Sequence, residues 1–238
     1  MGNSNFKQHY ETASKTGVLQ ITNNKIKDIP EEVLNLSENL RNLDLSKNKI
    51  SRITDEISKL KNLKQLKLDC NLIQDIPNSL TNLKKLELLN VSSNKISSLP
   101  QSFSYLTNLK QVYLSNNNFT HFPTQLYGLK NLDVVEISNN KISEVPRGMA
   151  NFFAAELNLS QNEISSLPDD FHQAPRLKIL KLEENCLNLD AIHPSLLSDS
   201  KLHTINLEGN LFETKQLASL EGYNEYTERY TAIKKKMF

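Results

Sequence analysis

The sequence contains no tryptophan and little cysteine or glycine: its 238 residues include two cysteines and six glycines. Two cysteines do not make the disulfide framework of a small secreted domain, and so few glycines leave no glycine-rich phosphate loop. No apolar run approaches the roughly 20 residues that a membrane-spanning helix requires. The first fifteen residues, MGNSNFKQHYETASK, are polar and lack the apolar segment of a secretory signal. Together these absences predict a cytoplasmic protein in a reducing compartment.

Charge and metal-ligating side chains give no sign of nucleic-acid binding or catalysis. Lys and Arg number 28 against 27 Asp and Glu, so no overall basic field would attract nucleic acid. The five histidines are scattered, and none lies beside cysteines or acids at metal-ligand spacing. We therefore expect no metal, no cofactor and no catalytic residues. An enzyme would need a catalytic domain outside the repeats described next.

One phrase recurs along most of the chain: L-x-x-L-x-L-x-x-N-x-L, with Ile, Val or Phe often in place of Leu. Its asparagines are separated by 22 to 25 residues, a spacing too regular for chance. They are Asn24, Asn48, Asn71, Asn94, Asn117, Asn140, Asn162, Asn185 and Asn210.

Each repeat combines two spacings of apolar residues. Around Leu66 and Leu68, apolar residues alternate with polar ones, which predicts a short half-buried strand. After the asparagine the chain turns and reaches Pro77, and leucines then recur every third position, which suits a 3₁₀ return leg. A return leg needs more width than the about 4.8 Å of a strand, so stacked coils would bend with the strands inside.

The phrase resembles the leucine-rich-repeat family, in its cytosolic form with 23-residue repeats. The resemblance implies an α/β fold, a curved leucine-rich-repeat solenoid with a parallel β-sheet on its concave face and helical caps at both ends. It divides the chain into an N-terminal tail and helical cap (1–16), nine repeats (17–212), and a C-terminal helical cap with a basic tail (213–238).

Helical spacing predicts both caps. Phe6, Tyr10 and Ala13 lie on one face of a helix that would stop at Gly17. After the last repeat, apolar and aromatic residues again have helical spacing: Leu217, Leu220, Tyr223, Tyr226, Tyr230 and Ile233. We interpret these tyrosines as packed residues, although phosphorylation sites are an alternative.

Two interpretations apply to the nine asparagines. In the first, the asparagines are binding residues that each repeat presents once. In the second, they form a structural ladder, in which each side-chain amide bonds backbone groups in the turn between coils. The second is how the family uses this residue, and it satisfies buried polar groups whose loss costs several kcal/mol. We favour the structural ladder.

The exposed strand positions are the candidate protein-binding site. Three apolar residues on consecutive strands would form a spot ringed by polar groups, and the later strands carry several acids. The alternative is that apolar residues there merely suit strands. The candidate residues are Leu88, Tyr113, Val134, Glu136, Glu156, Ile179, Lys181 and Glu183.

The amino terminus suggests a lipid tether. MGNS offers the Gly2 that N-myristoylation needs, although Phe6 stands where the usual pattern has Ser or Thr. The tail segments LKLEENCLNLD and LEGYNEYTERYTAIKKK resemble a group of animal leucine-rich-repeat proteins that also start MGNS and are assigned a myristoyl group. Lys234, Lys235 and Lys236 would add weak contact with an anionic membrane surface.

The sequence thus predicts a non-catalytic protein-protein interaction module that uses its concave face and is tethered through Gly2 to the cytosolic face of a membrane. The first alternative is a soluble regulatory subunit or signalling scaffold of the Ras or phosphatase type, without membrane attachment. Both hypotheses have unidentified protein partners. They have no nucleic acid, no metal and no cofactor.

Overall fold

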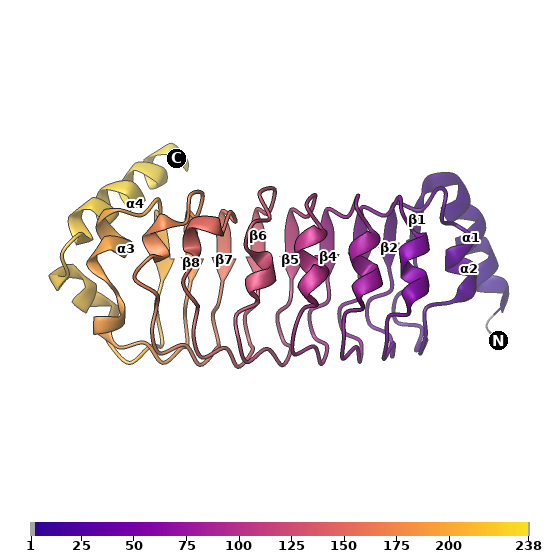
Figure 1. Cartoon of the computed structure of the whole chain (residues 1–238), viewed down its shortest axis with the longest axis horizontal. Helices are drawn as coiled ribbons and strands as arrows, with labels where there is room; N and C mark the ends of the chain where they lie inside the picture. Colours follow the sequence, from indigo (N-terminus) through magenta and orange to yellow (C-terminus); the bar gives the residue numbers. More distant parts are fainter. Residues whose placement is uncertain (1–2, 238) are drawn as a thin grey trace. The chain divides into compact units, whose positions relative to one another are not determined.

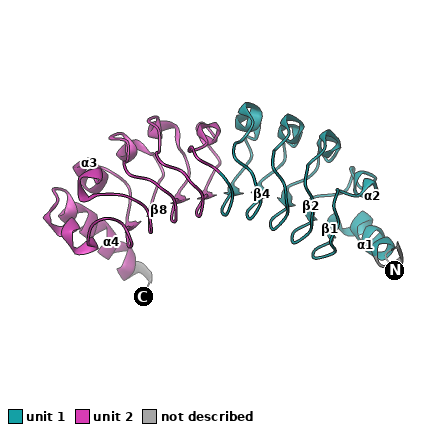
Figure 2. Cartoon of the chain, turned by 90° about the horizontal axis from the view of Figure 1, so that it is seen from below, with its two compact units in different colours: residues 1–118 teal, residues 119–238 magenta. Residues whose placement is uncertain are grey.

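The computed structural model describes residues 3–237, which form two compact units. Unit 1 is Met1–Asn118 and unit 2 is Phe119–Phe238 (Figure 2). Each unit is a stack of coils that contribute one short strand apiece. The three-part division expected from the sequence stays a prediction.

Unit 1 begins with helix α1 (Asn3–Thr16) and continues through five parallel strands. The strands are β1 (Val18–Gln20), β2 (Asn42–Asp44), β3 (Gln65–Lys67), β4 (Leu88–Asn90) and β5 (Gln111–Tyr113). The return legs carry helix α2 (Glu31–Leu34) and three 3₁₀ segments, Asp55–Lys59, Asn78–Asn82 and Gln101–Tyr105. In Figure 1, α1 lies beside α2 and β1.

Unit 2 contributes four parallel strands: β6 (Val134–Glu136), β7 (Glu156–Asn158), β8 (Ile179–Lys181) and β9 (Thr204–Asn206). Its return legs carry 3₁₀ segments at Thr124–Leu126, Met149–Asn151, Phe171–Gln173 and Leu189–Ala191, and helix α3 (Pro194–Ser198). A last 3₁₀ segment, Thr214–Ser219, leads into helix α4 (Tyr223–Met237). In both units the strands line the inner side and the helical segments of the return legs the outer side (Figure 2).

The core of every coil is the apolar half of the repeated phrase. Leu66 and Leu68 are fully buried, as are Leu80, Leu83 and Leu86 on the return leg. Pro77 precedes the 3₁₀ segment in extended conformation (ψ 150°), which starts the tight turn and explains the three-residue apolar spacing. A buried leucine contributes about 1.5–3 kcal/mol, so stacking stabilises coils that cannot bury this face alone. The predicted strand and return leg are confirmed.

A left-handed residue stands directly before each ladder asparagine. Eight of these residues are not glycine and have φ between 52° and 59°; the ninth is Gly209, with φ 77°. Most side chains disfavour this conformation, so the bonds made by the following asparagine must hold the turn in place. The eight are Asn23, Lys47, Cys70, Ser93, Asn116, Asn139, Gln161 and Glu184.

Helices cover β1 in unit 1 and β9 in unit 2. In unit 1, α1 ends before Gly17 (φ 74°), where an added Cβ would lie 2.7 Å from the Asn39 carbonyl oxygen. Ala13 is buried, while Phe6 and Tyr10 are half-buried. In unit 2, the Ile205 N–H of β9 donates to the Tyr226 hydroxyl of α4 (3.1 Å). The helices expected at both ends are therefore present.

Candidate protein-binding surface

The ladder asparagines make one repeated set of hydrogen bonds, which Asn71 illustrates. Its Nδ2 donates to the carbonyls of Leu68 (2.9 Å) in its own coil and Leu45 (3.1 Å) in the preceding coil. Its Oδ1 accepts from the backbone N–H of Ile50 (2.9 Å). One side chain thus bonds backbone groups of two coils. Equivalent bonds to the preceding coil's N–H are made by Asn48, Asn94, Asn117, Asn140, Asn162, Asn185 and Asn210.

The first asparagine of the series differs from the others. Asn24 is exposed, and its Nδ2 donates within its own turn to the Thr22 carbonyl (2.7 Å). Its backbone N–H instead donates to Asn48 Oδ1 (2.9 Å). The Asn24 turn belongs to the first coil, and the element before it is helix α1. The Asn24 side chain therefore has no carbonyl of an earlier coil to bond.

The three apolar candidates are divided between the units. Leu88 and Tyr113 lie on the strand face of unit 1, but Leu88 pairs with Gln111 and Tyr113 pairs with Asn90, so the two are offset by two residues. The Tyr113 hydroxyl donates to Gln111 Oε1 (3.3 Å). Val134 belongs to unit 2, where it pairs with Glu156. All three side chains are half-buried.

The strand face of unit 2 brings the remaining candidates together. Register places Val134, Glu156, Ile179 and Thr204 in one row and Glu136, Asn158, Lys181 and Asn206 in the next. Because successive residues of a strand point to opposite faces, both rows share the same face. Glu183 lies two residues beyond Lys181, on the chain that leaves β8.

Lys181 is the centre of a charged network, here called the Lys181 cluster: Glu136, Glu156, Asn158, Ser160, Lys181, Glu183 and Asn206. Lys181 Nζ lies 2.5 Å from Glu156 Oε1 and 4.0 Å from Glu136 Oε1. Asn158 Nδ2 donates to Glu136 Oε2 (2.7 Å). Glu183 accepts from Asn206 Nδ2 (2.7 Å) and from the Ser160 hydroxyl. Two carboxylates thus pair with one ammonium group, and the Glu183 carboxylate lies in the same hydrogen-bonded network and acts on Lys181 through its charge.

Partial burial perturbs the charges of this cluster. The side chains of Glu136 and Lys181 are 21% and 31% exposed. Burial raises the pKa of Glu136, because desolvation disfavours the carboxylate more than the Asn158 bond and Lys181 favour it. The hydrogen bond to Glu156 raises the pKa of Lys181. For Glu183, burial opposes ionisation, but bonds from Ser160, its backbone and Asn206 outweigh it and lower the pKa.

Sequence reasoning missed the polar residues that hold these carboxylates. Asn158, Ser160 and Asn206 occupy strand-face positions like the candidate residues, yet nothing in their type marks them as partners of glutamate. The signal that would have found them is the repeat spacing itself. Aligning the coils at their 22- and 23-residue offsets puts Asn158 beside Glu136.

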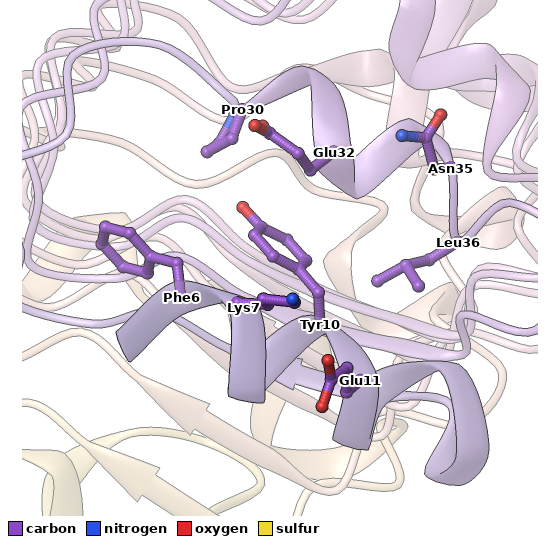
Figure 3. A pocket seen from close by; sticks show the side chains of 8 residues that line it. All are labelled: Phe6, Lys7, Tyr10, Glu11, Pro30, Glu32, Asn35 and Leu36. Atoms are coloured by element: carbon purple, nitrogen blue, oxygen red, sulfur yellow. The ribbon is translucent and has the colours of Figure 1, made fainter. Parts of the chain in front are cut away.

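A hollow lies in unit 1, between α1 and α2 (Figure 3). Phe6, Tyr10 and Leu36 give it an apolar floor, and Lys7, Glu11 and Glu32 surround it. Burial, and next the nearby Glu32 carboxylate, raises the pKa of Tyr10 to about 12.

Within residues 3–237, no group of three or more His, Cys, Asp or Glu side chains is placed to hold a metal ion. Cys70 and Cys186 are free and exposed. In the same part of the chain, no helix has the length and apolarity to cross a membrane. Gly2, the predicted lipidation site, lies outside the described residues.

The repeat geometry agrees with comparisons to known proteins. Residues 15–73 and 61–119 match the family model described as leucine rich repeat. The same turn, strand and asparagine bonds continue through Asn210. The chain has the leucine-rich-repeat fold, and residues 15–119 also match the family in sequence.

Particular relatives share part of the chain. A plant intracellular Ras-group-related LRR protein 7 of Oryza sativa subsp. japonica is 38% identical over 69 residues, which are 29% of this chain and 26% of that protein. The chain therefore matches about a quarter of this curated relative.

Solved structures extend the likeness of the fold over most of the chain. The ectodomain of the Arabidopsis thaliana receptor kinase GASSHO1/SCHENGEN3, in complex with Casparian strip integrity factor 2, is 32% identical with a TM-score of 0.68. The match covers 81% of this chain and 24% of that one. An internalin from Listeria monocytogenes gives a TM-score of 0.72 at 24% identity, over 90% of this chain and 61% of that one.

Proposed function

We propose that the protein is a non-catalytic interaction module that binds a protein partner through its strand faces, with the Lys181 cluster as the centre of contact. The leucine-rich-repeat fold supports protein binding in general. The receptor ectodomain with a similar fold is described in complex with another factor. The choice of surface rests on the charges of unit 2.

The carrying observation is the geometry of the Lys181 cluster, in which partly buried Glu136 and Glu156 face Lys181 on the strand face and burial raises the pKa of Glu136. A half-buried carboxylate that is costly to ionise is a liability for stability, and such groups concentrate at functional sites. Three glutamates and one lysine leave the cluster with two uncompensated negative charges. Unit 2 as a whole has 12 Lys and Arg against 16 Asp and Glu, a net charge of −4. The partner segment that complements this surface is basic.

Membrane tethering is the second part of the proposal. We infer a myristoyl group on Gly2 from the MGNS start, and a mass spectrum of the mature amino terminus tests it directly. One myristoyl chain gives only marginal attachment, with a partition constant on the order of 10⁴ M⁻¹. We therefore expect a large soluble pool, and a Gly2→Ala variant that fractionates with the soluble protein at physiological salt.

The alternative is a soluble regulatory subunit or signalling scaffold without a lipid. The likeness to a Ras-group-related leucine-rich-repeat protein favours it. An unmodified Gly2 in the mature protein, together with unchanged fractionation of Gly2→Ala, would support this alternative and remove the tether. The strand-face proposal does not depend on that outcome.

The binding proposal is tested by affinity capture with charge-matched variants. Glu136→Gln with Glu156→Gln removes two carboxylates from the strand face. We expect this variant to capture at least tenfold less of the main partner than wild type does. Rising salt should release the partner from wild type. The control is Glu144→Gln with Glu163→Gln, two exposed acids of unit 2 outside the strands. Equal loss in both pairs, or no loss in either, would remove the Lys181 cluster as the binding surface.

A further inference from the structure

The turns that contain the ladder asparagines form one edge of unit 1, here called the turn edge. It consists of the residues directly before and after Asn24, Asn48, Asn71, Asn94 and Asn117. Backbone bonds stack these turns: Lys49 N–H donates to Ile26 (2.8 Å), Leu72 N–H to Ile50 (2.8 Å) and Lys95 N–H to Ile73 (2.8 Å). The turn edge is therefore a row of chain tips.

The turn edge is basic without an acid among its residues. Its ten positions are Asn23, Lys25, Lys47, Lys49, Cys70, Leu72, Ser93, Lys95, Asn116 and Asn118. The four lysines are exposed. Three coil steps of about 4.8 Å separate the first from the last, so all four fit within roughly 15 Å. Unit 1 has 16 Lys and Arg against 11 Asp and Glu, a net charge of +5.

An apolar side chain interrupts the row of lysines. Leu72 is 41% exposed, and its stacked position lies between those of Lys49 and Lys95. A single exposed leucine needs no explanation by itself. At the tip of a turn, flanked by lysines, it matches a surface that has charged headgroups outside and apolar chains beneath.

The amino end of α1 lies at the same edge. The chain reverses at Gly17, and Gln8, His9, Thr12 and Thr16 line one depression together with Val18, Gln20, Thr22 and Asn24. From Thr16 back to Asn3 the helix spans roughly 20 Å, as does the extended chain from Val18 to Asn24. The start of α1 is therefore level with the Asn24 turn, at the turn edge.

We propose that the turn edge of unit 1 docks on the surface of an anionic phospholipid bilayer, with the four lysines over the headgroups and Leu72 inserted between them. Each lysine near such a surface strengthens binding about fivefold. The proposal extends the tether at Gly2 and rests on it for firm attachment, since one acyl chain needs a second signal. The contact between lysines and lipid does not itself require the acyl group.

The test uses the full-length, unacylated protein and vesicles of phosphatidylcholine with or without 30% phosphatidylserine, at low salt. We expect sedimentation with the phosphatidylserine vesicles alone. The triple variant Lys25→Glu, Lys49→Glu, Lys95→Glu should bind them at least tenfold more weakly. The single variant Leu72→Ser should lose several-fold and leave the salt dependence unchanged, because no charge is altered.

A charge-matched triple variant at the opposite edge of unit 1 controls for net charge. Lys15, Lys59 and Lys61 are exposed and precede strands rather than follow them. Lys15→Glu, Lys59→Glu, Lys61→Glu should retain binding within about threefold, with thermal melts to show that both triples are folded. Equal losses in the two triples would overturn the proposal, as would absent vesicle binding. Retention of wild type by immobilised polyglutamate, without vesicle binding, would assign the edge to an acidic protein instead.

The acylated protein separates this proposal from the tether. Adding the myristoyl group to wild type should strengthen phosphatidylserine binding, and the turn-edge triple should reduce that gain. If Gly2 carries no lipid in cells while the unacylated protein still binds phosphatidylserine through the turn edge, the tether fails and the docking edge stands. If acylated protein binds both vesicle types equally and the triple changes nothing, the docking edge fails and the tether stands.

Discussion

Asn117 shows how one side chain stabilises two coils of unit 1. Its Nδ2 donates to the carbonyls of Val91 (3.0 Å), Leu114 (3.0 Å) and Ser115 (3.3 Å), and its Oδ1 accepts from Ile96 N–H (3.0 Å). The residue before it, Asn116, has φ 57°. Buried backbone groups and a disfavoured turn conformation thus depend on the same amide.

We expect Asn117→Ala to lower the free energy of unfolding by about 1–3 kcal/mol, because backbone groups lose a buried partner. Asn117→Asp should be worse at pH 7, since a carboxylate would face three carbonyl oxygens. Chemical denaturation measures both. The control Ser92→Ala, at a half-buried position nearby, should change the free energy by less than about 0.5 kcal/mol. Equal effects for Asn117→Ala and Ser92→Ala would contradict the structural ladder.

We expect the substitution Glu136→Gln to have opposite effects on stability and on partner binding. Its folded pKa is raised by burial, so its ionised form costs stability above that pKa, and the cost disappears as pH falls below the unfolded value. Glu136→Gln should therefore be more stable than wild type at pH 7, by less than about 1 kcal/mol because the side chain is partly exposed. The difference should vanish near pH 4.

The same variant should bind the basic partner more weakly at pH 7. Thermal melts from pH 4 to 8 and a binding titration measure the two effects. A Glu136→Gln protein that is less stable at pH 7 and binds normally would show that the carboxylate serves folding alone.

At the scale of elements, helix α4 covers the free edge of strand β9 in unit 2. The outer edge of β9 presents backbone groups that would otherwise pair with another chain. The Tyr226 hydroxyl accepts the Ile205 N–H, and the Arg229 guanidinium donates to the carbonyls of Leu202 (2.9 Å), Ser198 (3.2 Å) and Leu197. Helix α4 thus satisfies both the edge strand and the end of α3.

We expect Tyr226→Phe to destabilise unit 2 by about 1–2 kcal/mol, because the Ile205 N–H loses its buried acceptor. The unpaired Ile205 N–H should also raise the tendency to self-associate, which light scattering measures. The control Tyr223→Phe keeps the ring packing of α4 and should stay within about 0.5 kcal/mol of wild type. A Tyr226→Phe protein that matches the control in stability and in light scattering would show that the Tyr226 hydroxyl does not protect the edge.

Helical spacing was enough to predict α1 and α4 but not what their side chains bond. The positions of Tyr226 and Arg229 follow from the apolar face of the helix, whereas their partners belong to residues more than 20 positions earlier. The hollow between α1 and α2 was missed for the same reason: it is formed by two segments whose packing no local pattern encodes.

At the scale of the whole molecule, the period of the sequence predicted the class of fold, because a strand, a turn and a return leg recur with little variation. The period did not predict how charge is distributed. The net charge of +1 is the sum of +5 in unit 1 and −4 in unit 2. Nor did it predict the Lys181 cluster, since Lys181 meets Glu156 only through the pairing of β7 with β8.

The central claim, that the strand face is the binding surface, is tested most directly by placing one photo-crosslinking residue on a strand and another on the neighbouring return leg. Ile179 lies on β8 within the candidate surface, and Gln173 is exposed on the return leg that leads into β8. Irradiation in the presence of the partner should link it to position 179 and leave position 173 unlinked. Linkage at position 173 with none at position 179 would contradict the account and move the binding surface to the outer side of unit 2.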